Sequence, residues 1–214
     1  MSIFCFLVWY YPVGLYRNSE WTNAVNIRAF HALLLVVSSF VFASTFAHAI
    51  IAGSPSEEIA GAVTTLLGIL LYAFCGILSG PSELPGFWIF MYRVNPFTYL
   101  VSSFMSTTLG QAPAYCADDE FQTFAAPADV TCGQYLQDFI AASGGGYVSD
   151  PQAQGECHFC QIETTNQFLE TINVDWTTRW RDFGILWVYI VVNVLAAFAL
   201  YYSARVPKGK KEKK

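Results

Sequence analysis

The chain has 214 residues, of which 54% are hydrophobic, 17% are aromatic and 13% are charged, and its formal net charge is −5. The charged fraction is about half the ~25% that is usual for a soluble domain, which excludes an ordinary soluble globular protein. The composition instead predicts a protein that is largely surrounded by lipid.

The first 15 residues form a short aromatic stretch without any charge. This stretch reaches Pro12 after only a few helical turns, so we expect 1–15 to be a short membrane span, or a span that is cut at its start. A secretory signal peptide is not favoured, because a basic residue should precede its apolar core and none occurs before Arg17.

Three longer, strongly apolar stretches contain no Asp, Glu, Lys or Arg, and each exceeds the ~20 residues that cross a bilayer core. From them we predict membrane-spanning helices at 29–51, 59–80 and 183–204. The chain is thus divided into spans within 1–80, an intervening region at 81–182, and a last span with its tail at 183–214. The bounding charges are Arg28 and Glu57, Glu58 and Glu83, and Asp182 and Arg205.

The C-terminal tail sets the expected orientation. Residues 205–214 carry six basic side chains and one acidic side chain, and the positive-inside rule places such a flank in the cytoplasm. Alternating spans then put 81–182 outside, where 113–182 contain eleven acidic residues against two arginines. We therefore expect a multi-pass membrane protein with a cytoplasmic C-terminal tail and an acidic external region (81–182).

One further stretch, 94–117, is also free of charge, but it is rich in Ser and Thr and contains Asn95-Pro96. Such a polar stretch suits lipid poorly, and non-helical backbone at membrane depth is tolerated only against protein or water. As a full span it would also move the neighbouring cysteines into the reducing cytoplasm. We predict instead two helices that dip into the outer leaflet, Leu84–Tyr92 and Phe97–Leu109.

Four of the six cysteines lie in the external region. An even number of cysteines in an oxidising compartment predicts two disulfides, with three possible connectivities. A zinc site is the weaker alternative, because only one pair has zinc-knuckle spacing. Few apolar residues are left for a core here, so we expect the disulfides to stabilise the loop, and the nested pairing is favoured because it ties the loop ends together. The nested pairs are Cys116 with Cys160 and Cys132 with Cys157; Cys5 and Cys75 fall inside spans, where a small buried apolar role is usual.

The sequence lacks the motifs of nucleotide binding and of hydrolysis. Gly209-Lys210 has neither the upstream glycine nor the following Ser or Thr of a phosphate-binding loop, and no Gly-x-Ser-x-Gly or His-Glu-x-x-His motif occurs. We therefore predict that the chain is not itself an enzyme. His31 and His48 lie near the ends of one predicted helix, where a hydrogen-bonded interfacial histidine is more usual than a functional one.

Several long motifs, in one order, closely resemble the end of fungal pleiotropic-drug-resistance transporters, which are ABC transporters of the G type. The resemblance covers essentially the whole chain, from the third helix of the second membrane domain onward. It implies an all-α integral membrane protein, built from ABC-2 type helices with a disulfide-tied extracellular loop. The motifs are residues 9–14, 85–101, the four external cysteines, 179–187 and 204–208.

The resemblance also implies an ATP-driven exporter of hydrophobic drugs or xenobiotics. This chain would form part of its substrate path and the external lid, and would be inactive alone. In the family, the helix that corresponds to 59–80 lines the central cavity, and the spacing of Thr65, Ile69, Tyr72 and Gly76 places them on one helical face, where they would bind substrate. Helix–helix packing is the alternative use of that face, because small residues suit packing equally well.

The expected partners are the lipid bilayer, hydrophobic small molecules, and the nucleotide-binding domains and remaining membrane helices of a complete transporter, with no nucleic acid. No cofactor is expected in this chain, since ATP and magnesium would be bound by domains that it lacks. The competing prediction is a non-transport membrane protein that displays an acidic, disulfide-tied ectodomain to a binding partner.

Overall fold

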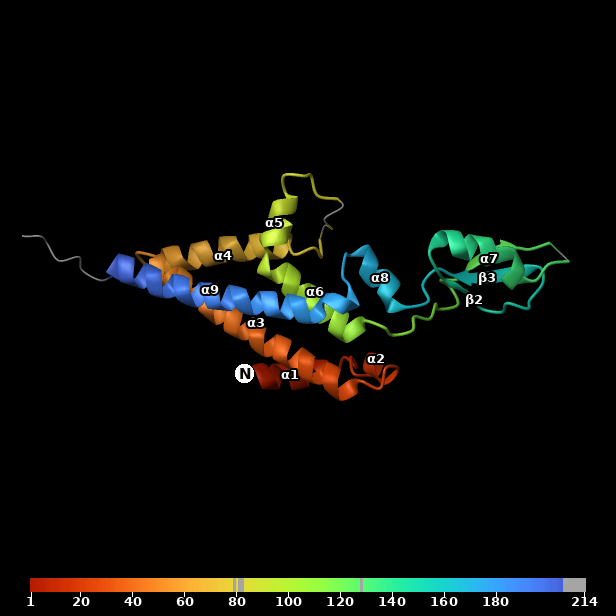
Figure 1. The fold of residues 1–214 in the computed structure, drawn as a ribbon, viewed down its shortest axis with the longest axis horizontal. Coiled ribbons are helices and arrows are strands. Elements are labelled where there is room, and N and C mark those ends of the chain that lie inside the picture. Colours follow the sequence, from red (N-terminus) through yellow and green to blue (C-terminus); the bar gives the residue numbers. More distant parts are fainter. Residues whose placement is uncertain (79, 81–82, 128, 206–214) are drawn as a thin grey trace, which may run out of the picture.

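Helices make up most of the computed structural model, which describes residues 1–78, 80, 83–127 and 129–205 (Figure 1). The long helices lie side by side, and a small sheet with its own helix lies beyond one end of them. The elements are α1 (Ser2–Tyr10), α2 (Arg17–Glu20), α3 (Val25–Gly53), α4 (Glu57–Ala73), α5 (Ile89–Val94), α6 (Pro96–Leu109), β1 (Gln122–Ala125), α7 (Cys132–Ser143), β2 (Tyr147–Val148), β3 (Glu156–Cys160), α8 (Thr165–Thr171), the 3-10 turn η1 (Trp176–Thr178) and α9 (Arg179–Arg205).

Helices α3 and α9 form the centre of the membrane part. Val25–Gly53 and Trp176–Ala204 are long and apolar enough to cross a membrane, and they include two of the predicted spans. The two helices pack through Phe42, Leu186 and Ile190, all of which are buried. Few other side chains of α9 are buried, as expected of a helix that is surrounded by lipid or by further membrane helices.

Helix α4 begins at a capped residue and ends earlier than predicted. The Ser56 side chain accepts a hydrogen bond from the Ile59 amide at 3.4 Å, which stabilises the helix start. The helix ends at Ala73 rather than at Gly80. The chain turns there, and Gly76 has φ +92°, a left-handed conformation that glycine adopts without strain. The 17 residues of α4 are about 26 Å long, near the lower limit for crossing a bilayer core.

Helix α1 is shorter than the predicted span 1–15. It ends at Tyr10 after nine residues, or about 13 Å, so this helix alone is too short to cross a bilayer core. Phe6 and Tyr10 are buried with Ala32 of α3 in one apolar cluster. Helix α1 therefore packs beside the first half of α3 (Figure 1).

Both predicted outer-leaflet helices are present, and the first has different bounds. Helix α6 runs from Pro96 to Leu109, close to the prediction. Helix α5 covers only Ile89–Val94, whereas the sequence predicted Leu84–Tyr92. The apolar and aromatic residues before Ile89 therefore form an irregular segment and not the first turns of a helix.

The side chain of Asn95, between α5 and α6, caps two helices at once. Its Oδ1 accepts a hydrogen bond from the Phe97 amide at 2.9 Å, at the start of α6. Its Nδ2 donates to the Leu71 carbonyl at 2.7 Å, in the last turn of α4. Since the last carbonyl groups of a helix have no partner within the helix, this second bond stabilises α4 where it ends.

Residues 116–127 and 129–160 form a compact cysteine-rich lobe. Strand β3 lies in the middle of its sheet and pairs antiparallel with β1 and with β2. Helix α7 packs on the sheet, and Leu136, Val148 and Phe159 are buried together with the sulfur atoms of one disulfide. The expectation that this region lacks material for a core was therefore wrong. The all-α description holds for the membrane helices, and the lobe adds a small sheet to them.

Two disulfides tie this lobe, and their order is nested. Cys132–Cys157 joins α7 to β3 with a sequence separation of 25, and Cys116–Cys160 joins the segment before β1 to the end of β3 with a separation of 44. In the chain-entropy model, loops of these lengths contribute about 3.5–4 kcal/mol each. Cys5 and Cys75 are free, and the Cys75 side chain is buried.

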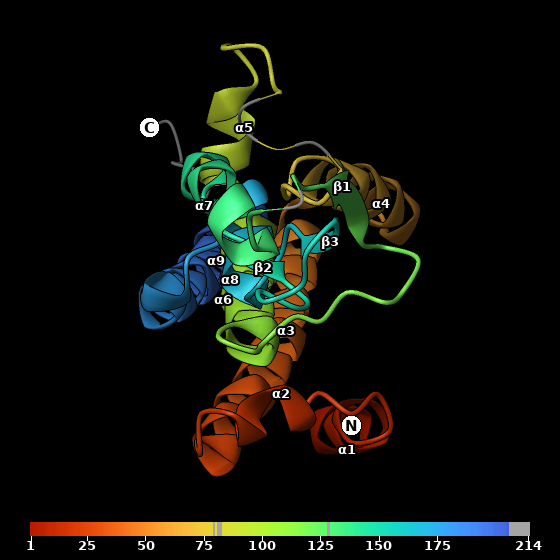
Figure 2. The same cartoon turned by 90° about the vertical axis from the view of Figure 1, so that its right-hand side faces the viewer.

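The lobe and the C-terminal end of α9 lie at opposite ends of the structure (Figure 1). We call the end of α3 and α9 nearer the lobe the outer end, and the other the inner end. Seen along the long axis (Figure 2), α4 and the α1–α2 pair lie on different sides of α3. Residues 206–214 of the basic tail, which decide the predicted orientation, lie outside the described residues.

Candidate functional site: the free face of α4 and the outer junction

Three of the four residues predicted to bind substrate lie on one exposed face of α4, which we call the free face. Thr65, Ile69 and Tyr72 are four and three residues apart, and all three are exposed, Ile69 and Tyr72 each by 61%. The buried side chain of this helix is Ala60. Thr65 and Ile69 are open to the surroundings, whereas Tyr72, near the end of the helix, also contacts α6.

The free face offers a mixed chemistry. The Thr65 hydroxyl donates to the Gly61 carbonyl at 2.9 Å, so its oxygen remains available as an acceptor. The Tyr72 ring packs against Phe97 of α6, with ring centroids 4.9 Å apart. An aliphatic side chain, an aromatic ring and two oxygen atoms thus lie together, which is typical of sites for apolar ligands.

Gly76 does not share this face. It follows the end of α4, so the prediction that places it on the same helical face is wrong. A methyl group at Gly76 would lie 2.7 Å from the ring of Tyr92, which is closer than carbon atoms approach. Together with its positive φ, this contact shows that Gly76 lets the bend after α4 pack against α5.

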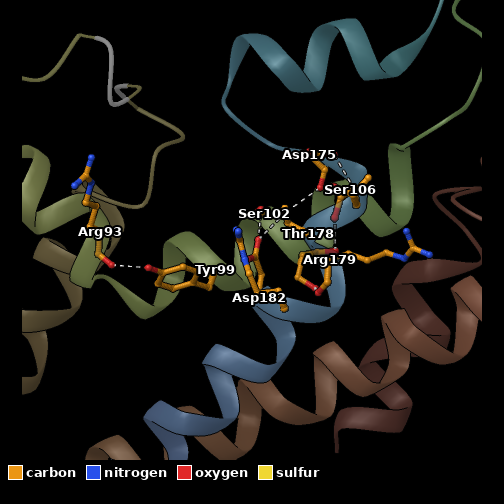
Figure 3. Close-up of polar contacts among 11 residues, drawn as sticks. Arg93, Tyr99, Ser102, Ser106, Asp175, Thr178, Arg179 and Asp182 are labelled. Atoms are coloured by element: carbon orange, nitrogen blue, oxygen red, sulfur yellow. Dashed lines mark hydrogen bonds and ion pairs between the residues drawn. The ribbon is translucent and has the colours of Figure 1, made fainter.

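A second cluster joins the beginnings of α3 and α9 to the end of α6, and we call it the outer junction. Its hydrogen bonds connect residues 76 to 82 positions apart in the chain. Most of its side chains are buried, and Figure 3 shows part of it. The members are Arg28, His31, Ser102, Ser103, Thr107, Gly110, Trp176, Thr178, Arg179 and Asp182.

Trp176 of the outer junction lies against two guanidinium groups. The Cζ atoms of Arg28 and Arg179 are 4.3 Å and 3.8 Å from its ring centroid. Arg28 is 3% exposed, and its Nη1 donates to the Gly110 carbonyl at 2.7 Å. A cation–π contact of a desolvated guanidinium contributes about 2 kcal/mol, which offsets part of the cost of burying the charge.

Asp182 is the buried acidic group of the outer junction (Figure 3). Its Oδ2 accepts hydrogen bonds from the hydroxyls of Ser102 at 2.7 Å and Thr178 at 3.3 Å. Its Oδ1 accepts from Arg181, whose Nε lies at 3.0 Å and whose Nη2 lies at 2.9 Å. The carboxylate is therefore fully bonded, and it holds α6 to the start of α9.

The turn η1, which leads into α9, has its own cap. The Asp175 side chain accepts a hydrogen bond from the Thr177 amide at 2.8 Å, and its carbonyl accepts one from the Thr178 hydroxyl at 3.1 Å. The bond from the Thr177 amide favours the ionised carboxylate and so lowers the pKa of Asp175. This cap fixes the direction in which α9 begins.

His31 joins α3 to both other helices of the outer junction. Its ring stacks on Trp180 with centroids 4.0 Å apart, and its Nδ1 lies 3.0 Å from the Thr107 hydroxyl. Its Nε2 is buried and has no partner among the described residues. The expected hydrogen bond is thus present for one ring nitrogen, and the stacking with α9 was not predicted.

Gly110 allows the tight contact between α6 and η1. A methyl group in its place would lie 2.5 Å from the Trp176 ring and 2.5 Å from the Ser106 carbonyl oxygen. Because both neighbours are fixed by packing or by the helix backbone, a larger residue would displace Trp176. The same glycine supplies the carbonyl that binds Arg28.

Sequence reasoning missed the outer junction, because its members look like ordinary polar residues at the ends of spans. One signal was present: Ser and Thr occupy five of the seven positions in 102–108, at a depth where polar groups need partners. A single sequence does not show which partners they find. The partners are more than 70 positions away and meet α6 only in the folded chain.

The fold and its site can be compared with known proteins. The family model of the ABC-2 type transporter matches residues 1–109, about half of the chain. The chain therefore belongs to the ABC-2 type transporter family, and it is a membrane component of that class.

Individual relatives agree with this assignment. The chain is 54% identical to ABC multidrug transporter F of Aspergillus fumigatus over 98% of its length, and 47% identical to ABC multidrug transporter C of the same species over 100%. It is 48% identical to ABC multidrug transporter atrG of Aspergillus oryzae, also over 100%. It spans 14% of the length of each of these proteins.

Proposed function

We propose that the chain forms one wall of the substrate path in an ATP-driven exporter of hydrophobic compounds. The observation that carries the proposal is the free face of α4, where Thr65, Ile69 and Tyr72 are exposed although the helix is packed on α3 and α6. The relatives support the substrate class, since several are named multidrug transporters. Nucleotide binding and hydrolysis are assigned to parts of the transporter outside this chain.

The attachment of α4 suggests how the wall moves. Asn95 and Thr98 bond to backbone carbonyls at its outer end, Leu71 at 2.7 Å and Phe74 at 3.4 Å. The remainder of α4 contacts α3 and α6 mainly through apolar side chains, which impose no fixed direction. Closure of the nucleotide-binding domains would tilt α4 about this attached end and deliver substrate from the free face toward the lobe.

The cysteine-rich lobe is the external lid in this proposal. It follows α6 and precedes α9, so both of its connections leave from the outer junction (Figure 1). Its disulfides keep it compact while the helices below it move. In our proposal the transporter lies in the plasma membrane, and the C-terminal tail of this chain lies in the cytoplasm.

The proposal is tested in a complete transporter that contains this chain. Tyr72→Ala removes an aromatic ring from the free face, and Thr65→Val removes an oxygen acceptor without changing the volume. We expect the relative resistance to individual compounds to shift by roughly fivefold to tenfold, because a lost ligand contact is worth about 1–1.4 kcal/mol. Leu67→Ala, on the opposite side of α4, is the matched control. An unchanged resistance spectrum for both variants, at normal protein levels, would contradict the assignment.

A further inference from the structure

A groove between α3 and α9 lies at their inner end, away from both the free face of α4 and the outer junction. Its volume is about 710 Å³, within the roughly 300–1,000 Å³ of small-molecule sites. Apolar residues make up five of the nine that line it, and among the described residues no acidic, lysine or arginine side chain lines it. The residues used below are Ser44, Thr45 and His48 of α3 and Val194, Phe198 and Tyr201 of α9.

His48 is the distinctive polar group of this groove. Its Nδ1 lies 2.7 Å from the Ser44 carbonyl oxygen, and a carbonyl can only accept, so Nδ1 carries the proton. The Nε2 atom of the neutral ring is then a hydrogen-bond acceptor. It has no partner among the residues that the structure describes. An acceptor in an apolar groove selects a ligand that brings a donor.

Two of the other polar groups of the lining are less suited to this role, whereas the exposed Ser44 hydroxyl, one turn before His48, has no hydrogen-bond partner among the described residues. The Thr45 hydroxyl donates back to carbonyls of its own helix, Val41 at 2.9 Å and Phe42 at 3.0 Å. Tyr201 is 57% exposed and lies one turn beyond Phe198, at the rim. His48 and Ser44, four residues apart on α3, therefore provide the polar contacts within the groove, and the ring nitrogen of His48 is the acceptor used below.

The depth of His48 in the membrane is the depth at which the polar end of an amphiphilic ligand would lie. It lies five residues before the end of α3 at Gly53, which is about 7–8 Å along the helix. This depth is near the boundary between headgroups and hydrocarbon. Toward the bilayer centre the groove continues along Val194, so a ligand with its polar end at His48 would place its apolar body in the hydrocarbon.

We propose that this groove binds a neutral lipid with an apolar body of sterol size and a single hydroxyl group. The hydroxyl donates to Nε2 of His48, and the body packs against Val194 and Phe198. Among the residues that the structure describes, no cationic side chain lines the groove to bind the phosphate of a phospholipid. This lipid is a resident ligand of the α3–α9 pair and not the compound carried along α4.

The test uses a complete transporter that contains this chain, in membranes, and a photoactivatable diazirine sterol with a free hydroxyl. We expect labelling of peptides from both walls of the groove, 44–52 and 194–201. The unlabelled hydroxyl sterol should compete roughly threefold to tenfold better than its methyl ether, which can no longer donate the hydrogen bond. Equal competition by the ether, or labelling spread evenly over the lipid-facing helices, would overturn the proposal.

Substitutions in the groove distinguish the contribution of the hydrogen bond to ligand binding from the contribution of the groove's shape. His48→Leu should lower labelling by roughly threefold to tenfold, whereas His48→Gln, which retains an acceptor, should lose less. Thr45 lines the same groove, and Thr45→Val should leave labelling unchanged, because the hydroxyl that it removes is bonded within α3. Non-reducing electrophoresis shows whether each variant retains its lobe disulfides and hence its fold. Unchanged labelling of a folded His48→Leu variant would contradict the role of Nε2.

Discussion

At the outer end of the α3–α9 pair several hydroxyl groups bond across helices and others, such as Ser106 and Thr108, bond within α6, whereas at the inner end the hydroxyl bonds stay within one helix. At the outer end, the hydroxyls of Ser102, Ser103 and Thr107 bond to groups on other helices. Toward the inner end, the hydroxyls of Ser39 and Thr45 donate to carbonyls of their own helix. Cross-element bonds fix the relative positions of helices, whereas bonds within a helix do not. The outer end is thus specified as one rigid unit, and the inner end is held by apolar packing.

This difference matters because lipid removes the usual hydrophobic force between helices. Where only apolar side chains meet, two helices can separate and let lipid take the place of the contact. The groove at His48 and the free face of α4 both belong to this weakly specified part. The lobe and the outer junction, by contrast, are held by disulfides and by hydrogen bonds between elements.

The largest effect is expected from removing a disulfide of the lobe. A Cys132→Ala/Cys157→Ala double variant should lose about 3.5 kcal/mol of the lobe's unfolding free energy, because the bond closes a loop of 25 residues inside the core. The measurement is the rate at which an added protease cleaves the lobe in intact cells. Cys5→Ser, which touches no disulfide, is the control. Equal cleavage rates for the two variants would show that apolar packing and the Cys116–Cys160 disulfide hold the lobe without this bond.

The next effect concerns the buried carboxylate of the outer junction. Asp182→Leu should lower the unfolding free energy by about 2–4 kcal/mol, because Ser102 and Thr178 lose their acceptor. Arg181→Gln removes the exposed partner of the same ion pair and should cost less than about 1 kcal/mol. Thermal unfolding of both variants in lipid nanodiscs gives the comparison. A larger loss for Arg181→Gln would mean that the ion pair, and not the hydroxyl bonds, holds α6 to α9.

The smallest effect compares two serines directly. Ser103→Ala removes a bond of 2.8 Å to the Arg179 carbonyl of another helix, and should cost about 1 kcal/mol. Ser39→Ala removes a bond of 2.7 Å within α3, and should change stability by less than about 0.5 kcal/mol, because such bonds add little to a formed helix. Equal losses in the same unfolding assay would remove the distinction between the two ends.

The sequence predicted those features that depend on local composition. Charge-free length identified α3 and α9, and the external cysteines indicated two disulfides. The end of α4 was misplaced, because 74–80 are as apolar as the helix itself and only the turn at Gly76 marks its end. The core of the lobe was missed because Leu136, Val148 and Phe159 are far apart in the chain and meet only when the sheet forms.

The candidate site also has one part that the sequence predicted and one part that it did not. The spacing of Thr65, Ile69 and Tyr72 was sufficient to place them on one face, since helical periodicity is a local property. The outer junction and the double cap at Asn95 depend on pairs separated by 24 to 82 residues. No local pattern encodes such a pairing.

The central claim is that the free face of α4 lines a path open to water and substrate. The most direct measurement is the reaction of Ile69→Cys, in a complete transporter without Cys5 and Cys75, with a charged, membrane-impermeant thiol reagent. Our account predicts that Ile69→Cys is labelled, that a transported compound slows the labelling, and that Leu67→Cys on the opposite side is unreactive. An unreactive Ile69→Cys, or labelling that no transported compound slows, would show that this face meets lipid or another helix and would contradict the account.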